Sequence, residues 1–552
     1  MKRPSLPLAL ACAVMAIGTR GMAQTYTAAN PLTVDTTQEP VAAGKFQPTW
    51  DSLNQYQVPE WFRDAKFGIW AHWGPQCVAE DGDWYARNMY MQGRPQYNYQ
   101  VAHFGHPSQV GFKDDIHQWK AENWDPEKLV ALYKRAGAQY FFALANHHDN
   151  FDLWDSKYQP WNAVKVGPQK DLIGGWAKAA RDNGLRFGVS IHAAHAWSWY
   201  EPSQGSDKTG PLAGVPYDGN TKASDGAGKW WDGLDPQDLY AQNHVPGRKL
   251  VWNWDVTQGS SVPNKAYIEK FYNRTIDLIN KYNPDLVYFD DSVLPLWPIS
   301  DAGLKIAAHL YNSSMAQHNG QLEAVMFGKD LQPDQRPAVT LDIERGRSNQ
   351  IEALPWQTDT CIGNWHYQKD LFEHHKYKTA KTVVQILADV VSKNGNLLLN
   401  IPVKSDGTID SDELKIVQGI ANWMDVNKES IFGTRPWKVF GEGPASSGPA
   451  PAPGAKMNFN EKSAKPFTAQ DVRFTSKGNT LYAIVLGVPN KPLSIKSLGS
   501  DKNLVSRINS ISLLGDSGEV HWTQNDSDLQ IEPPTSKPAT DYAVVYKIDT
   551  TP

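Results

Sequence analysis

Three adjacent polar residues, His147, His148 and Asp149, follow an apolar run at residues 139–146. They could bind a metal ion, hold a sugar through its hydroxyl groups, or satisfy each other within a turn. Zinc ligands usually come from separate positions, and adjacent residues on a strand point in opposite directions. An imidazole can both donate and accept hydrogen bonds at a sugar edge. The metal interpretation is therefore the weakest of the three, and we expect no metal ion and no other cofactor.

A pair of carboxylates, Asp290 and Glu344, is the second feature that could do chemistry. Each follows an apolar run, LVYF at 286–289 and AVTLDI at 338–343. Glycosidic bonds are broken by two such groups that flank the bond. Asp291 is next to Asp290, but only one of two adjacent strand residues can face the site. The alternative role for a strand-end aspartate is to cap a helix or anchor a loop.

Short apolar stretches alternate with helical patterns, which predicts the elements that carry these residues. We expect strands at 66–73, 139–146, 186–194, 285–291, 323–330, 337–344 and 396–402, and helices at 125–136, 171–182, 266–282 and 378–392. This alternation indicates a parallel α/β architecture. Polar residues collect where the strands end, at His72, 146–149, His192, Asp290, Glu344 and Asn400. In a (β/α)8 barrel those ends form the face that carries the chemistry, so we predict a (β/α)8-like (TIM) barrel.

The division of the chain follows from its composition. Residues 1–23 have Lys2 and Arg3, an apolar stretch and small residues before Gln24, which is typical of a signal peptide. Its removal takes away three basic residues and no acidic ones, so the net charge changes from -5 to -8. We expect the barrel at 24–440, a Pro/Gly/Ser linker or loop at 441–456, and a C-terminal antiparallel β-sandwich at 457–552. The signal peptide predicts a secreted or periplasmic protein, in which Cys77 and Cys361 could pair.

The bulk composition narrows the class of protein. Hydrophobic residues make up 41% of the chain and charged residues 20%, which suits a packed protein. There is no basic patch of the kind that binds nucleic acid, and no later stretch is long and apolar enough to span a membrane. We therefore expect neither nucleic acid nor membrane as a partner.

A long region at 201–259 is rich in glycine and aspartate and carries Trp230, Trp231, Trp252 and Trp254. Loops of this length are usually functional or disordered. Because it follows an expected barrel strand, we predict that it lies on the catalytic face, where Asp232 and the tryptophans contact sugars beyond the cleaved one. The alternative is that the tryptophans only pin the loop to the barrel.

Six ordered stretches make the chain resemble the α-L-fucosidases of glycoside hydrolase family 29. They are WFRDAKFGIWAHWGP with GDWYARNMY; NHHDNFDLWDSKYQPWN and the residues that follow it to RFGV; NPDLVYFDD; PWQTDTCIGNWHY; VVQILADVVSKNGNLLLNIPVKSDGTI; and SIFGTRPW. Together they extend from Trp61 to Trp437. The resemblance implies a retaining, exo-acting enzyme whose partner is a fucosylated glycan, such as xyloglucan or an N-glycan core.

The resemblance also implies roles for individual residues. Asp290 matches the nucleophile, and Glu344 is the best match for the acid/base, with Glu352 as the alternative. The sugar-binding candidates are His72, Asp83, Trp84, His147, His148, His192, Tyr288, Lys329 and Trp365. Asp83 stands where the family has a glutamate, Tyr288 where it has a tryptophan, and Lys329 or Arg336 where it has an arginine. A fucose relative such as α-L-galactose, an inactive carbohydrate-binding barrel and a metal-dependent hydrolase are the competing interpretations.

Overall fold

The computed structural model describes residues 30–241, 252–446, 457–505 and 507–551. The expected signal peptide, and residues 447–456 of the expected linker, lie outside these ranges.

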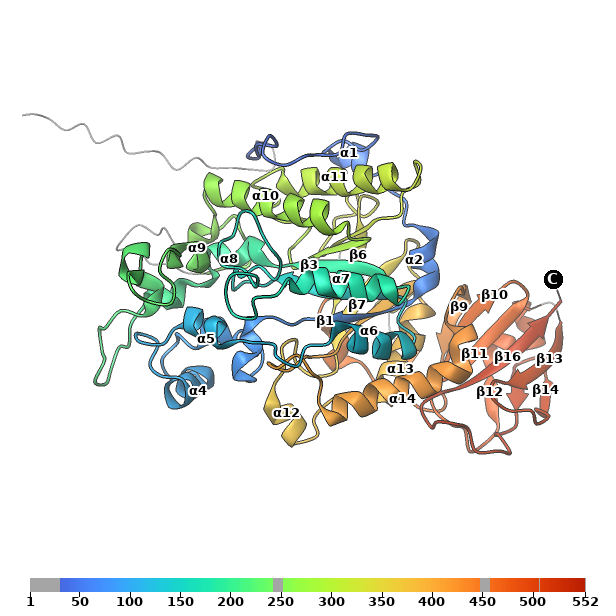
Figure 1. The fold of residues 1–552 in the computed structure, drawn as a ribbon. Coiled ribbons are helices and arrows are strands. Elements are labelled where there is room, and N and C mark those ends of the chain that lie inside the picture. The colour runs from blue at the N-terminus through green and yellow to red at the C-terminus, as the bar shows by residue number, and fades with distance from the viewer. Residues whose placement is uncertain (1–29, 242–251, 447–456, 506, 552) are drawn as a thin grey trace, which may run out of the picture.

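Eight parallel strands close into a barrel in chain order (Figure 1). They are β1 Phe67–Ala71, β2 Tyr140–Asn146, β3 Arg186–Ile191, β4 Leu286–Phe289, β5 Val325–Gly328, β6 Thr340–Glu344, β7 Trp356–Cys361 and β8 Gly395–Asn400. The barrel closes where β1 pairs with β8, with Phe67 beside Leu397. The predicted barrel is thus confirmed, and seven of its strands lie at the predicted places. The sequence did not predict β7, because its residues WQTDTC contain no apolar run.

Long helices cover the outside of the barrel (Figure 1). They are α6 Pro126–Arg135, α7 Leu172–Asp182, α10 Lys265–Tyr282, α11 Ala302–Gln317, α13 Ala380–Val391 and α14 Ser411–Asn427. Asp125 caps α6 by accepting a hydrogen bond from the backbone of Lys128, with Pro126 in the first turn. The structure adds α11 and α14, which were not predicted. In α14, Asp410 and Glu413 form a reciprocal capping box.

Shorter helices lie before β1 and in the connections between strands. They are α1 Trp50–Leu53, α2 Glu60–Ala65, α3 Tyr85–Asn88, α4 Pro95–His103, α5 Phe112–Gln118, α8 Ala196–Trp199, α9 Pro236–Tyr240 and α12 Lys369–Glu373.

The barrel interior is filled by large side chains from alternate strand positions. Trp70, Tyr140, Phe142, Tyr288, Phe327 and Leu398 belong to one buried cluster, with Phe62 of α2 at one end. The residues between them, such as Phe141 and Val287, pack outward against the helices. Side chains alternate along a strand, so the next inward positions after Tyr288 and Phe327 are Asp290 and Lys329. The strand pattern therefore aims these two polar groups at the carboxyl end of the barrel axis.

The C-terminal region is a two-sheet antiparallel sandwich (orange to red in Figure 1). One sheet has the order β13-β16-β11-β10-β9 and the other β12-β15-β14. Their bounds are β9 Arg435–Glu442, β10 Val472–Lys477, β11 Thr480–Val485, β12 Leu493–Ile495, β13 Ile508–Leu513, β14 Trp522–Gln524, β15 Leu529–Ile531 and β16 Val544–Thr550. This confirms the predicted sandwich. Its first strand, β9, begins on the N-terminal side of the Pro/Gly/Ser stretch.

Buried polar contacts hold the sandwich against α13 and α14. Gln385 of α13 donates to the carbonyl of Leu486 at 2.8 Å, and Trp423 of α14 donates to the carbonyl of Ala543 at 2.9 Å. Asp389 of α13 accepts from Arg473 Nε at 2.6 Å. The charge of Lys393 and that of Arg473 outweigh the effect of burial and hold the pKa of Asp389 well below its usual range.

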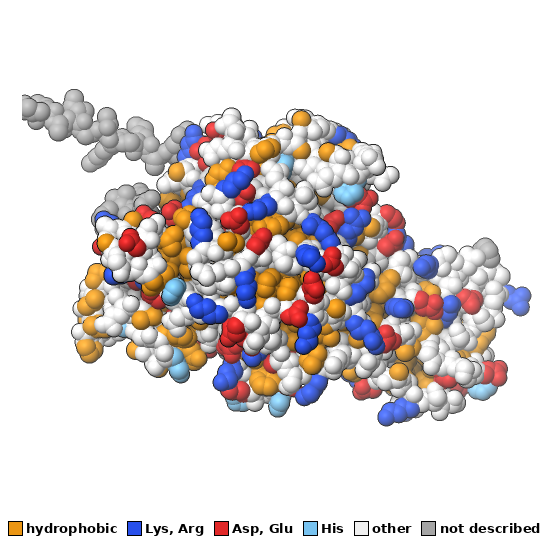
Figure 2. Space-filling model, viewed as in Figure 1, with side chains coloured by type: hydrophobic (Ala, Val, Ile, Leu, Met, Phe, Trp, Pro, Cys, Tyr) orange, Lys and Arg blue, Asp and Glu red, His pale blue; other side chains and the backbone are white. Residues whose placement is uncertain are grey.

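Basic and acidic side chains are interspersed on the face drawn in Figure 2. No helix in the described part of the chain has both the length and the hydropathy of a bilayer-spanning segment. Cys77 and Cys361 are buried free thiols, so the possible disulfide is not formed in this structure.

Candidate active site

A cavity of about 530 Å³ opens at the carboxyl ends of the barrel strands. It is lined by Trp70, His72, Trp84, His147, His192, Trp254, Tyr288, Asp290, Asp291, Ser292, Lys329, Asp330, Glu344, Asp359, Trp365, Asn458 and Phe459. Most of these residues come from strand ends or from the loops that follow them. The structure thus brings together most of the residues that the sequence singled out.

Lys329 joins the two candidate catalytic carboxylates at the centre of the cavity. Its Nζ atom lies 2.7 Å from Asp290 Oδ1 and 2.6 Å from Glu344 Oε2. Burial alone would raise the pKa of Asp290, but the charge of Lys329 and hydrogen bonds from His148 and His192 hold it well below its usual range. Burial, together with the charges of Asp290 and Asp359, raises the pKa of Glu344 to about 7. At neutral pH one carboxylate is therefore ionised while the other retains a proton for a large fraction of the time.

Two histidines contact the second oxygen of Asp290. His148 Nε2 lies 3.2 Å from Asp290 Oδ2, and His192 Nδ1 lies 3.4 Å from the same atom. His148 Nδ1 lies 2.8 Å from the carbonyl oxygen of His192. His148 is thus placed by the His192 carbonyl on one side and by Asp290 on the other. Asp290 therefore contacts Lys329 through Oδ1 and the two histidines through Oδ2.

His147 lines the cavity, whereas His148 does not line it and contacts Asp290, although the two histidines are adjacent in the chain. The Gln76 amide donates to His147 Nδ1 at 2.7 Å and to Asp149 Oδ2 at 3.2 Å. Asp149 thus fixes the orientation of the Gln76 amide group. Because the amide N–H donates to Nδ1 of His147, the hydrogen of this neutral ring is on Nε2. The three polar residues at 147–149 therefore have different roles. His147 lines the cavity, His148 contacts Asp290, and Asp149 holds the Gln76 amide that bonds to His147.

His72, His147 and His192 form a cluster whose ligand atoms lie within 4.8 Å of one another, which is close enough to share a metal ion. Burial and the neighbouring histidines keep the pKa of His72 and of His147 well below the usual value, and burial lowers that of His192 to about 4. The rings are therefore neutral and could act as ligands. However, His147 offers only Nε2, and that atom carries the hydrogen. Neutral rings with one N–H each are equally suited to sugar hydroxyl groups.

The floor of the cavity is a layer of aromatic and acidic side chains. Tyr288 donates from its hydroxyl to Asp359 Oδ2 at 2.8 Å, and Lys329 Nζ lies 5.1 Å from the centre of the Tyr288 ring. Asp359 comes from β7, so the strand that the sequence did not predict carries an acid that the sequence also missed. Burial raises the pKa of Asp359 and that of its neighbour Asp342. Beside the effect of burial, the charge of Asp359 contributes to the raised pKa of Glu344.

The walls are built from tryptophans. Trp365 lies 5.4 Å from Trp70 and 5.6 Å from His72 between ring centres. Trp84 and Trp254 both pack edge-on against His148, at 6.2 Å and 5.4 Å. Trp254 is still 46% exposed. The cavity therefore has large apolar faces around a polar centre, which is an arrangement suited to a sugar.

The long region at 201–259 contributes only part of what was predicted. Trp254 lines the cavity, and Trp252 packs behind Trp84 at 5.2 Å. Trp230 instead stacks on His117 at 4.1 Å, and Trp231 is buried. Neither residue lines the cavity, and the predicted stacking of Trp231 on a sugar ring is wrong because Trp231 is buried, whereas that of Trp230 stays a prediction. Residues 242–251 of this region lie outside the described ranges.

Three other candidates from the sequence lie away from the cavity. The Asp83 carboxylate accepts the backbone N–H groups of Trp365 and His366, at 3.2 Å and 2.7 Å, so it shapes the loop after β7. Glu352 accepts from Ser348 at 2.7 Å and faces Arg336 at 3.6 Å. Neither Glu352 nor Arg336 lines the cavity.

Asp291 belongs to the cavity wall but not to the Lys329 cluster. It pairs with His195 at 2.8 Å, while Asp290 faces the barrel axis. The two adjacent aspartates therefore point in different directions, as the strand geometry predicts.

Two lining residues, Asn458 and Phe459, come from beyond the Pro/Gly/Ser stretch. The backbone N–H of Glu344 donates to Asn458 Oδ1 at 2.9 Å, and the N–H of Phe459 donates to the carbonyl of Glu344 at 2.7 Å. The sequence carries no signal for this contact, because the partners are 114 residues apart.

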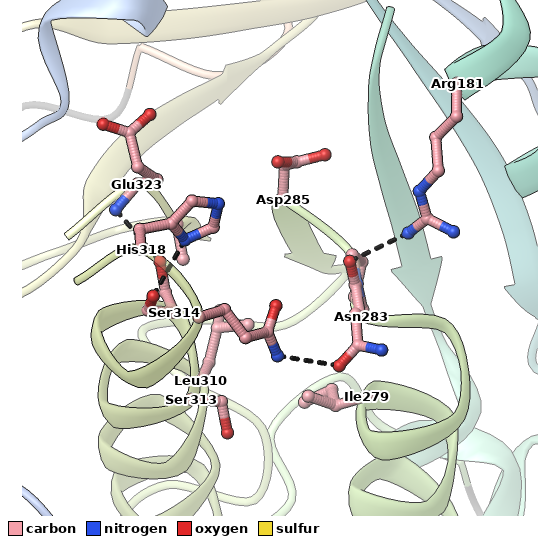
Figure 3. Close-up of a pocket in the computed structure, with 12 residues that line it drawn as sticks. Arg181, Ile279, Asn283, Asp285, Leu310, Ser313, Ser314, His318 and Glu323 are labelled. Atoms are coloured by element: carbon pink, nitrogen blue, oxygen red, sulfur yellow. Dashed lines mark hydrogen bonds between the residues drawn. The ribbon is translucent and has the colours of Figure 1, made fainter. Parts of the chain in front are cut away.

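A second cavity, of about 250 Å³, lies between α10 and α11 near the amino ends of β4 and β5 (Figure 3). Its polar groups bond mainly to one another; Gln317 donates to Asn283 at 2.8 Å. In a barrel of this kind the amino ends serve stability rather than catalysis. The first cavity is therefore the candidate active site.

Known proteins resemble this chain over most of its length. The family model described as Alpha-L-fucosidase matches residues 33–429, and the model described as Alpha-L-fucosidase C-terminal domain matches 465–549. Tissue alpha-L-fucosidase from Homo sapiens is 25% identical over 510 residues, covering 90% of each chain. Alpha-L-fucosidase from Branchiostoma floridae is 25% identical over 504 residues, covering 89% of this chain and 92% of its own.

Solved structures share the fold. The Thermotoga maritima alpha-fucosidase in complex with a mechanism-based inhibitor has a TM-score of 0.65 and 23% identity, covering 91% of this chain and 100% of its own. Alpha-L-fucosidase isoenzyme 1 from Paenibacillus thiaminolyticus has a TM-score of 0.60 and 21% identity, with the same coverage. At this identity the likeness shows a common architecture of barrel and sandwich.

Proposed function

Since this chain belongs to the α-L-fucosidase family of glycoside hydrolases, we propose that it releases terminal α-L-fucose from glycans by a retaining double displacement. The observation that carries the proposal is the Asp290–Lys329–Glu344 arrangement in the cavity. Such a reaction requires one ionised carboxylate and one protonated carboxyl group, and here both of these groups contact Lys329.

The spacing of the two carboxylates favours retention. Both contact the same nitrogen, at 2.7 Å and 2.6 Å, so their nearest oxygens are at most about 5.3 Å apart. Retaining glycosidases hold their carboxyl groups about 5–5.5 Å apart, whereas inverting ones leave room for a water molecule between them. The arrangement therefore supports direct attack on the sugar by one carboxylate.

We assign the nucleophile to Asp290 and the acid/base to Glu344. In the first step Asp290 attacks the anomeric carbon as the glycosidic bond breaks, and Glu344 gives its proton to the leaving oxygen. In the second step Glu344 takes a proton from water, the water oxygen bonds to the anomeric carbon, and Asp290 departs. Lys329 and His148 keep Asp290 ionised before the first step and stabilise it again as it leaves.

The neutral histidines and the tryptophans account for sugar binding in this proposal. His72, His147 and His192 each present an N–H or a lone pair to a ring hydroxyl. Trp84, Trp365 and Trp254 offer flat apolar faces to the C–H groups of the ring and to the methyl group of a 6-deoxy sugar. Tyr288 closes the floor, although Asp359 accepts its hydroxyl hydrogen.

The direct test combines Asp290→Ala with identification of the released sugar. Wild-type protein should release L-fucose from fucosylated oligosaccharides, xyloglucan fragments or N-glycans. The variant should lose turnover by a factor on the order of 10⁴, because it loses the nucleophile and its charge together. Azide should partly restore activity and give a β-fucosyl azide. Release of L-galactose instead of fucose would contradict the proposed sugar, and an active Asp290→Ala variant would contradict the mechanism.

The proposal includes a secreted or periplasmic location, which rests on the signal-peptide pattern at 1–23. Amino-terminal sequencing of the protein exported by its native host should begin at Gln24. Recovery of the intact amino terminus from the cytoplasm would contradict this location.

A further inference from the structure

The segment at 457–463 returns from the C-terminal region to the catalytic end of the barrel and is firmly held there. The Glu461 carboxylate accepts from Arg345 Nε at 2.9 Å, from Thr360 Oγ1 at 2.8 Å and from Lys378 Nζ at 3.1 Å. Asn460 both accepts from and donates to the backbone of Arg347, at 3.0 Å and 2.9 Å. These contacts fix the two residues that precede them at the mouth of the cavity.

This segment forms hydrogen bonds with both the backbone N–H and the backbone carbonyl of Glu344. Asn458 Oδ1 accepts the Glu344 N–H, and the Phe459 N–H donates to the Glu344 carbonyl. Asn458 also donates from Nδ2 to Asp330 Oδ1 at 3.2 Å. The acid/base candidate is therefore bonded through its own backbone to Asn458 and Phe459, and not only to barrel strands.

Phe459 is unusual for a residue held so firmly. Its φ angle is 61°, in the left-handed region that residues with side chains adopt at a cost. The residue is 59% exposed, the largest value among the exposed large hydrophobic residues in the described part of the chain. Neither feature favours folding, yet the contacts of Asn460 and Glu461 maintain both. A strained backbone that presents an exposed ring at the edge of a site points to a binding role.

The proposed reaction indicates which part of the substrate would lie beside the Phe459 ring. Glu344 protonates the leaving oxygen, so the sugar that carries this oxygen must lie on the Glu344 side of the cavity. Phe459 and Asp330 line that side, and Ser292 donates to Asp330 Oδ2 at 3.3 Å. The aromatic face can take the C–H face of a pyranose, while Asp330 and Ser292 can bond to its hydroxyl groups.

We propose that Phe459 is the platform for the leaving-group sugar, a neutral pyranose stacked on its ring and bonded to Asp330, so that the C-terminal region determines which fucosides are cleaved. This inference rests on the proposed function. It assigns to Phe459 a role in specificity that is separate from the fixing of Glu344, for which the segment uses its backbone and Asn458.

The experiment compares two substrates on Phe459→Ala. α-L-Fucosyl fluoride has no leaving sugar, whereas a set of fucosyl disaccharides of different linkage supplies one. For the disaccharide that wild type cleaves best, kcat/KM relative to the fluoride should fall roughly five- to tenfold, the size of one aromatic contact. Phe459→Trp should keep the wild-type ratio. Leu414→Ala, which removes an exposed apolar side chain of α14 outside the cavity, should keep it as well.

The possible outcomes are distinct. An unchanged ratio in Phe459→Ala, which includes an equal loss on both substrates, would overturn the platform. A ratio that falls by the same factor for every disaccharide, whatever its linkage, would also overturn it, because fluoride leaves without a proton and such a fall indicates a defect in proton transfer from Glu344. A wild-type enzyme that hydrolyses the fluoride and no disaccharide would also overturn it, while leaving in place the proposed double displacement at fucose. A wild-type protein inert towards every fucoside would overturn both.

Discussion

Lys329 lies between Asp290 and Glu344 and contacts both carboxylates at once, at 2.7 Å and 2.6 Å. A single cation thus contacts both the proposed nucleophile and the proposed acid/base. Its pKa is well above the usual value, because the two carboxylates outweigh the effect of burial, so it remains charged throughout the working range. Its charge lowers the pKa of both acids, whereas burial and the neighbouring acids raise that of Glu344, and the histidines beside Asp290 lower that of Asp290 further.

Replacement of Lys329 by methionine tests this relationship. Lys329 lowers the pKa of both acids, so its loss should raise both, and protonation of Asp290 should then produce an acidic limb within the measurable range. We expect kcat/KM at the optimum to fall by about 10²-fold or more, since a charge aimed at the reacting groups is lost. Lys329→Arg, which keeps the charge, should retain more activity and no new acidic limb. A rise in KM with an unchanged pH profile would instead make Lys329 a simple sugar contact.

The pH dependence of the wild-type enzyme follows from the same two groups. The pKa of Asp290 is well below its usual range, so it remains ionised down to mildly acidic pH, whereas the pKa of Glu344 is about 7. The acid form of Glu344 is present below that value and is lost as the pH rises through it. We therefore expect kcat/KM to decline above about pH 7, with the apparent pKa belonging to the coupled pair. A profile that stays flat to pH 9 would exclude Glu344 as the acid.

Much of the barrel was predictable because its strands are apolar runs that end in polar residues. The inward positions of Asp290 and Lys329 follow from the period of two along β4 and β5. The family was also identified correctly, because six motifs in the right order are specific, whereas a single motif is not. β7 was missed because its inward positions are Gln357 and Asp359, which form a buried polar layer in place of an apolar one.

Other parts of the site depend on contacts that no local pattern reveals. Phe459 reaches Glu344 across a Pro/Gly/Ser stretch and more than a hundred residues of chain. Trp230 and Trp254 belong to the same loop and the same residue type, yet only Trp254 lines the cavity, because their partners lie on other elements. Such outcomes are set by tertiary packing, so the sequence could offer candidates without choosing among them.

The choice between Glu344 and Glu352 can be made with matched variants. Glu344→Ala should reduce hydrolysis of natural fucosides by about 10²–10⁴-fold, because the leaving oxygen needs a proton. It should largely spare the first step on an aryl fucoside with a good leaving group, measured as a burst of released phenol. Glu352→Ala removes the same side chain outside the cavity and should keep activity on both substrates. Equal losses on both substrates with Glu344→Ala would argue against acid/base catalysis by this residue.

The cluster of His72, His147 and His192 gives a test of the metal interpretation. We expect dialysis against EDTA to leave kcat unchanged and metal analysis to find no stoichiometric ion. The reason is that Gln76 fixes His147 with its hydrogen on Nε2, which makes this ring a donor towards the cavity. His147→Ala should then weaken sugar binding, seen as a raised inhibition constant for fucose. Bound zinc that leaves with EDTA together with activity would refute this interpretation.

The two tryptophans of the long loop provide a comparison between binding and anchoring. Trp254 lines the cavity and packs against His148 and His195, whereas Trp230 stacks on His117 and donates from Nε1 to Asp114 at 2.9 Å. The two side chains are similarly exposed, at 46% and 38%. Trp254→Ala should therefore lower kcat/KM on fucosylated oligosaccharides roughly five- to tenfold with little change in Tm.

Trp230→Ala should lower stability and leave activity unchanged. Its ring lies outside the cavity, so the lost stacking and hydrogen bond should cost about 1–2 kcal/mol of stability, while kcat/KM stays near that of wild type. Thermal unfolding and oligosaccharide kinetics on both variants separate the two roles. If Trp230→Ala loses activity without losing stability, the loop reaches the substrate by a surface other than the one that Trp254 presents. If Trp254→Ala instead loses stability and keeps its activity, its contact with His148 is structural and the wall of the cavity does not bind sugar.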